Sequence, residues 1–164
     1  MTILLFISIV VNILFISYIF IQNARNEKVM NQYYSFIQQD LVHLDAAITF
    51  QISTNWENEN FVILKIYEVK KNISQALHIG TNLKVLTEHQ KGLLNRIYEF
   101  FDNIDKHTGY PQQYYTDEEK GELIKLHERL VKAELSIENN SYSNRWGEFE
   151  DKLLIILNDG VSIQ

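Results

Sequence analysis

The sequence predicts an all-α protein, with an N-terminal transmembrane helix followed by an antiparallel four- to five-helix bundle. Three observations lead to this fold class. An apolar run without a charge fills most of the first 21 residues, apolar residues behind it recur at steps of three and four, and the chain has one proline and six glycines. Steps of three and four are the helical period, and few prolines and glycines imply long elements. We expect a membrane anchor at residues 1–25 and a bundle domain at 26–160.

The apolar run begins at Ile3, ends at Ile21 and contains no charged residue. At 1.5 Å per residue it spans about 28 Å, close to the roughly 30 Å hydrocarbon core of a bilayer. A cleavable signal peptide would have a positive segment before a shorter run and small residues at the cleavage site. No Lys or Arg precedes this run, and Gln22 stands two residues before Ala24, where a small residue is needed. We therefore predict an uncleaved signal anchor, with a removed signal or a buried helix of a soluble protein as alternatives.

Arg25 and Lys28 lie just behind the apolar run, and no basic side chain precedes it. The positive-inside rule therefore places the C-terminal domain in the cytoplasm. We predict a single-pass protein of the cell membrane with this orientation, and the extracytoplasmic orientation stays open.

The helical period continues behind the anchor without a break, since neither proline nor glycine occurs before Gly80. We expect one rod of about 50 residues and roughly 75 Å, ended by the polar run at 55–60. Its apolar positions either pack on other helices of the same chain or form a coiled-coil homodimer through the helix from Met30 to Ile52. These positions are Met30, Tyr33, Phe36, Ile37, Leu41, Leu44, Ile48 and Ile52.

A second helix is expected over 62–77, ended either by the residues 80–82, with Gly80 in a left-handed conformation, or at a capping box from Thr87 to Gln90. A third follows to Ile104. The segment 107–115 holds the only proline and is predicted to be a loop.

A capping box at Thr116 and Glu119 predicts the start of a fourth helix, whose apolar positions continue to Ile137. After a polar loop at 138–144, a last helix begins at Trp146 and is stopped by the residues 158–160. No segment shows sustained alternation with β-branched residues, so no strand is predicted.

The composition excludes several classes of function. Without cysteine the chain has no disulfide, no thiolate nucleophile and no cysteine-based zinc site. Its net charge is −6 and its basic residues are scattered, so we expect no nucleic-acid partner. Isoleucine and asparagine make up 36 of the 164 residues, a skew that favours an AT-rich, bacterial genome.

No catalytic or metal-binding motif is complete. His127 and Glu128 begin the helical zinc motif HExxH, but the second histidine is missing. His43 and Asp45 lie two residues apart, which on a helix points their side chains away from each other. Nucleophile motifs, phosphate loops and a complete calcium loop are absent from the sequence as well. We therefore predict no catalytic residue, no metal and no cofactor.

Aromatic residues provide the one candidate contact surface. Tyr110, Tyr114 and Tyr115 crowd the proline loop, and Trp146 lies at a helix end. Tyrosine and tryptophan are enriched at interfaces, but they also pack across helix ends. The leading interpretation is a membrane-anchored protein-interaction or regulatory module with an unknown protein partner. An extracytoplasmic sensor or envelope-stress domain is the alternative, and an enzyme with an unrecognised active site in the bundle is the third.

Overall fold

The computed structural model describes residues 2–104 and 115–157, and it confirms the all-α fold class. Within these ranges the chain forms five helices and no strand, with one isolated antiparallel bridge between Leu135 and Asn140. The helices are α1 (Thr2–Ser53), α2 (Asn60–Asn82), α3 (Glu88–Ile104), α4 (Asp117–Lys132) and α5 (Trp146–Leu157).

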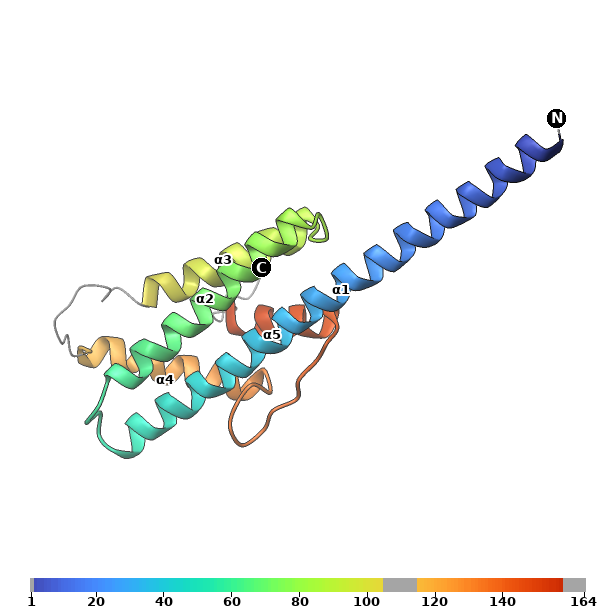
Figure 1. The fold of residues 1–164 in the computed structure, drawn as a ribbon. Helices are drawn as coiled ribbons and strands as arrows, with labels where there is room; N and C mark the ends of the chain where they lie inside the picture. The colour runs from blue at the N-terminus through green and yellow to red at the C-terminus, as the bar shows by residue number, and fades with distance from the viewer. Residues whose placement is uncertain (1, 105–114, 158–164) are drawn as a thin grey trace, which may run out of the picture.

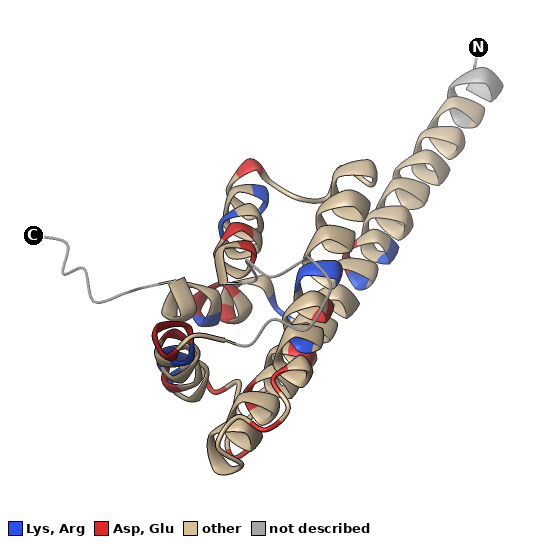
Figure 2. Cartoon of the chain, turned by 90° about the vertical axis from the view of Figure 1, so that its left-hand side faces the viewer, with Lys and Arg blue, Asp and Glu red and all other residues tan. Residues whose placement is uncertain are grey.

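The first helix is one unbroken rod of 52 residues, as its period predicts. Its N-terminal half projects alone from the bundle, and its C-terminal half packs in it (Figure 1). Between Ile7 and Ile21 the large apolar side chains are 39% to 71% exposed, whereas Met30, Ile37 and Leu41 are buried. The projecting segment from Ile7 to Ile21 carries no charged side chain (Figure 2). By length and composition, α1 is the one helix in the described part of the chain that could cross a membrane.

The bundle is built on an antiparallel hairpin of α1 and α2 (Figure 1). α3 packs on α2, α4 packs on α1, and α5 contacts α1, α3 and α4, which closes the bundle. The inward positions of all five helices form a single core. The apolar series that could form a seam with a second copy is largely part of this core, because Ile37, Leu41, Leu44 and Ile48 are all fully buried by the chain's own helices.

The turn between α1 and α2 lies where the polar run at 55–60 predicts it. Asn55 and Trp56 adopt left-handed backbone angles, with φ of 53° and 63°. The Trp56 N–H donates to the Gln51 carbonyl at 2.8 Å, and the Asn58 N–H donates to the Gln51 side-chain oxygen at 3.0 Å. Gln51 therefore caps the end of α1 with both its backbone and its side chain.

The end of α2 is predicted correctly, but the role assigned to Gly80 is wrong. Lys84, not Gly80, takes the left-handed conformation, with φ of 56°. Gly80 lies inside the helix, where a Cβ atom would stand 2.5 Å from two carbon atoms of Leu86. The capping box is also present, since the Gln90 N–H donates to Thr87 Oγ1 at 3.2 Å and the Thr87 N–H donates to Gln90 Oε1 at 2.8 Å. The two breaks that were predicted as alternatives are therefore both present: one is the end of α2 and the other is the start of α3.

Replacing Gly80 with alanine should lower the free energy of unfolding by about 1 to 2 kcal/mol, because the new methyl group overpacks the buried Leu86. Gly92 in α3 is the matched control, since nothing lies within 4 Å of a Cβ atom there. Gly92→Ala should raise the free energy of unfolding by up to about 1 kcal/mol through helix propensity alone. Chemical denaturation followed by circular dichroism measures both. Equal shifts of the same sign would contradict the close packing of Gly80.

The fourth helix begins at the predicted capping box and ends earlier than expected. The Thr116 N–H donates to Glu119 Oε2 at 2.8 Å, and the Glu119 N–H donates to Thr116 Oγ1 at 3.3 Å. The helix ends at Lys132, and Glu134 then adopts φ of 54°. Ile137 therefore lies in the loop 133–145 and not on the helix, so the prediction of its place is wrong. The expected loop before Tyr115 and the stop signal at 158–160 lie outside the described residues.

Candidate functional site

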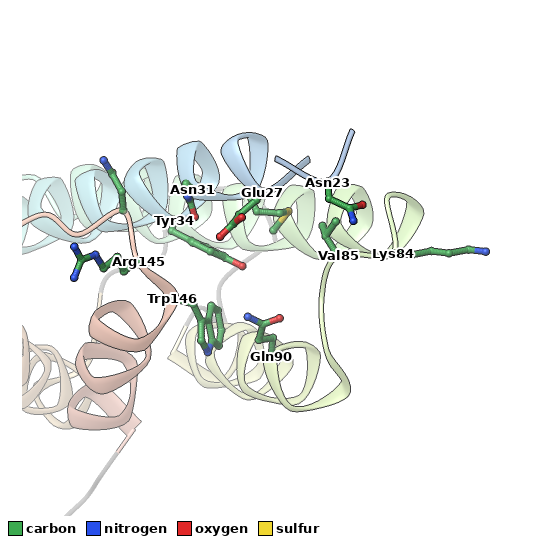
Figure 3. Close-up of a pocket in the computed structure, with 11 residues that line it drawn as sticks. Asn23, Glu27, Asn31, Tyr34, Lys84, Val85, Gln90, Arg145 and Trp146 are labelled. Atoms are coloured by element: carbon green, nitrogen blue, oxygen red, sulfur yellow. The ribbon is translucent and has the colours of Figure 1, made fainter. Parts of the chain in front are cut away.

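A cavity of about 480 Å³ lies where the bundle meets the projecting half of α1 (Figure 3). α1 forms one wall of the cavity, the connection from α2 to α3 forms the second wall, and the start of α5 forms the third. The described lining residues are Asn23, Glu27, Met30, Asn31, Tyr34, Lys84, Val85, Gln90, Asn144, Arg145 and Trp146.

Tyr34 closes the inner end of the cavity. The side chain is 3% exposed, and its ring stacks on Phe149 with 5.3 Å between the ring centroids. Side chains on a helix tilt toward its N-terminus, so the hydroxyl group of Tyr34 points along α1 into the cavity (Figure 3). It forms no hydrogen bond with any residue that the structure describes. Burial and then the negative charge of Glu27 raise the pKa of Tyr34 to about 12, so the hydroxyl group stays protonated and can donate.

Trp146 forms the side of the cavity, and among the described residues it is the one predicted contact residue that lines it. Its ring centroid lies 5.2 Å from that of Tyr34 and 5.8 Å from that of Phe149. Its indole N–H donates to Glu150, which also pairs with His89 of α3. The hydrogen bond from His89 is the main cause that lowers the pKa of Glu150. The ring of Trp146 is thus held in place by α1, α3 and α5.

The charged side chains take different positions around the cavity (Figure 3). The carboxylate of Glu27 points inward, toward the hydroxyl end of Tyr34, and Gln90 lies opposite. Lys84 extends away from the cavity on the side of Asn23, which is the side of the projecting half of α1. Arg145 extends in the other direction, and its guanidinium group lies 3.7 Å from Glu148. The interior is therefore acidic and aromatic, and a lysine stands at the end nearest to the apolar segment.

Tyr115, another predicted contact residue, does not line this cavity. Tyr115 is 3% exposed and packs on Trp56 at the far end of the bundle, with 6.3 Å between the ring centroids. Tyr110 and Tyr114 lie outside the described residues. Tyr34 was missed because the neighbouring Tyr33 was assigned to the apolar series. Glu27 was missed because a single exposed acidic residue near an anchor carries no signal in the sequence.

A second polar group joins α1, α4 and the loop 133–145. Asp45 is fully buried, and its carboxylate accepts from His127 Nδ1 at 2.7 Å and from the Ile137 N–H at 3.0 Å. Two helical turns before Asp45, the buried Gln38 side chain accepts from the Ser143 N–H at 2.9 Å and donates to the Ser143 carbonyl at 2.7 Å. The two residues thus hold both halves of the loop against α1.

The pair of Asp45 and His127 resembles part of a hydrolytic triad but lacks its geometry. Thr49 is the nearby hydroxyl group, and its oxygen lies 3.5 Å from the same Nδ1 atom that Asp45 contacts. A nucleophile needs the opposite ring nitrogen, so that the imidazole relays between carboxylate and hydroxyl. Among the described residues, no three histidine or acidic side chains gather as a metal site would require. We therefore take the cavity, and not this polar group, as the candidate site.

Comparisons of the chain with protein families, with curated proteins and with solved structures give no match.

Proposed function

We propose that the chain is a single-pass membrane protein whose helical bundle acts as a protein-interaction or regulatory module at the bilayer surface. The exposed apolar half of α1 carries this proposal. No other part of the described chain covers its large side chains from Ile7 to Ile21, and a soluble protein rarely exposes such a continuous apolar surface. Insertion in lipid would bury all of it at once, and the length of the segment suits a single crossing.

The outer surface of the hairpin supports an interaction role. On α1, Phe36 lies one turn before Asp40, which accepts a hydrogen bond from Asn72 of α2. Phe50 lies within about 40° of Phe36 around the helix axis. Phe61 lies eleven positions before Asn72, on the same face of α2, and together with Phe36 and Phe50 it forms an exposed aromatic stripe on the outer surface of the hairpin. Further exposed apolar residues of α2 flank this aromatic stripe; they are Leu64 and Tyr67. Large apolar side chains on an outer helix face are typical of a surface that binds another protein.

A homodimer through the helix from Met30 to Ile52 would have to use this same stripe, because the inward positions of that helix belong to the core. The residues in question are Phe36 and Phe50, which lie fourteen positions apart on the outer face. The orientation with the bundle in the cytoplasm follows from Arg25 and Lys28 and remains part of the proposal.

The test uses the full chain with a photo-reactive amino acid in place of Phe50, expressed in cells and followed by separation of the membranes. We expect the chain to resist extraction at alkaline pH, and the probe to form a discrete cross-linked product whose mass shows either another protein or a second copy. A probe at Glu128, on the exposed face of α4, is the control. Extraction of the intact chain into the aqueous fraction would refute the membrane anchor. Equal cross-linking from both positions, or none from either, would refute the interaction surface.

A further inference from the structure

We propose that the cavity beside α1 binds the headgroup of a zwitterionic phospholipid, with the ammonium group between Glu27 and the rings of Tyr34 and Trp146 and the phosphate toward Lys84. This inference rests on the proposed insertion of α1 in a bilayer. It assigns to the cavity a ligand chemistry that combines an ammonium group and a phosphodiester a few bonds apart.

The hydroxyl group of Tyr34 is the first observation that points to a ligand, because its side chain is only 3% exposed and aims this group into the cavity. A polar group at the inner end of a cavity requires a hydrogen-bond partner, since an unmade hydrogen bond costs more than a typical one contributes. The Tyr34 hydroxyl group has no partner among the described residues, yet it lies at the inner end of a cavity large enough for a small polar group. A bound ammonium group would donate a hydrogen bond to the oxygen of this hydroxyl group.

The charge and the ring faces inside the cavity select a cation. Glu27 is the one acidic side chain among the described residues that line it. Tyr34 and Trp146 form an aromatic corner next to that carboxylate. Aromatic faces together with a carboxylate are the arrangement by which proteins hold alkylammonium groups.

The order of these groups along α1 matches the order of groups in a lipid. Asn23 follows Ile21 by two residues and Glu27 follows it by six, so their Cα atoms lie about 3 Å and about 9 Å beyond the apolar run. The polar layer of a bilayer extends roughly 5 to 8 Å beyond the hydrocarbon on each side. Lys84, on the side of Asn23, is thus placed at the depth of the phosphate. Glu27 lies just beyond this layer, on the water side of the phosphate, which is the side from which the terminal ammonium group reaches it (Figure 3).

The experiment measures which lipids the full chain retains. The chain is reconstituted in nanodiscs that contain equal amounts of phosphatidylethanolamine and phosphatidylglycerol, released in mild detergent and weighed by native mass spectrometry. We expect bound phosphatidylethanolamine to be enriched over phosphatidylglycerol. Glu27→Gln and Tyr34→Phe should each weaken this binding by about tenfold, the cost of one hydrogen bond to a charged group.

Glu57→Gln and Tyr142→Phe are the matched controls, since both residues are exposed and neither lines the cavity; neither change should alter retention. Glu27 is exposed, so Glu27→Gln tests the site even if Tyr34→Phe proves to disturb folding. Water-soluble glycerophosphoethanolamine is added in a second arm. Displacement only at concentrations far above that of the lipid supports a membrane ligand, whereas equally tight binding of the soluble compound would overturn it.

The outcomes separate this inference from the proposed function. If the chain enters the nanodiscs but retains both lipids equally, or if the cavity variants retain lipid as the controls do, the headgroup site is wrong and the anchor stands. If the chain does not enter the nanodiscs, the anchor itself is wrong.

Discussion

An Asp45→Ala chain should lose about 3 kcal/mol of its free energy of unfolding, a large share of the stability of a small domain. Asp45 is fully buried, and its two oxygens hold His127 of α4 and the N–H of Ile137. Alanine would leave both donors without an acceptor. Removing a buried acceptor costs more than its hydrogen bonds contribute, because the donors left behind lose their partner. Urea unfolding of the full chain in detergent, followed by circular dichroism, measures the loss.

Two further variants separate the parts of this effect. Asp45→Asn keeps an oxygen acceptor while it removes the charge, so its loss of stability should be smaller than that of Asp45→Ala. Asp151→Ala removes an exposed acid of α5 and should change the free energy of unfolding by less than about 0.5 kcal/mol. A loss for Asp45→Ala no larger than that for Asp151→Ala would show that the buried carboxylate does not hold the loop 133–145.

Arginines in place of Val11 and Phe15 should remove the chain from the bilayer. An arginine near the middle of a transmembrane helix costs roughly 2.5 to 3.5 kcal/mol on insertion scales, so the two together cost about 5 kcal/mol or more. The two side chains are 57% and 62% exposed, so their replacement breaks no packing within the bundle. We expect the double variant in the aqueous or aggregated fraction after membrane separation, with its helical content otherwise retained.

The matched control is the pair Val11→Leu and Phe15→Leu, which changes the same positions and keeps them apolar. This variant should remain with the membranes as the unmodified chain does. Retention of the double arginine variant in alkaline-extracted membranes, equal to that of the leucine variant, would mean that the segment is held there by something other than lipid burial.

Local signals in the sequence predict most of the helices and several of their ends. The capping boxes at Thr87 and Thr116 form the hydrogen bonds that their residue types predict, because each of these bonds joins atoms only three residues apart. The rod of α1 follows from its unbroken period and the absence of proline. The prediction of how α2 and α4 end fails, and the cause is also local. Lys84 and Glu134 adopt left-handed backbone angles, which the sequence would assign to glycine.

The cavity and the polar group around Asp45 could not be predicted in the same way, because the parts of each meet only in the folded chain. Asp45 and His127 are 82 residues apart, and each looks like an isolated polar residue on its own helix. The cavity depends on where α5 places Trp146 against Tyr34, which no periodicity encodes. A polar residue inside an apolar stripe, such as Gln38 or Asp45, was the one available sign that a distant backbone segment would need a partner.

In the proposed membrane-anchored state, α1 crosses the bilayer and continues without a break into the bundle. There is therefore no hinge between the anchor and the domain. When the anchor tilts, for example because the membrane becomes thinner, the whole domain must rotate with it as a rigid body. From Ile21 to the end of α1 the arm is about 48 Å long, so a tilt of about 20° would sweep its far end sideways by roughly 16 Å. Membrane thickness would thereby set the angle at which the aromatic stripe meets its surroundings.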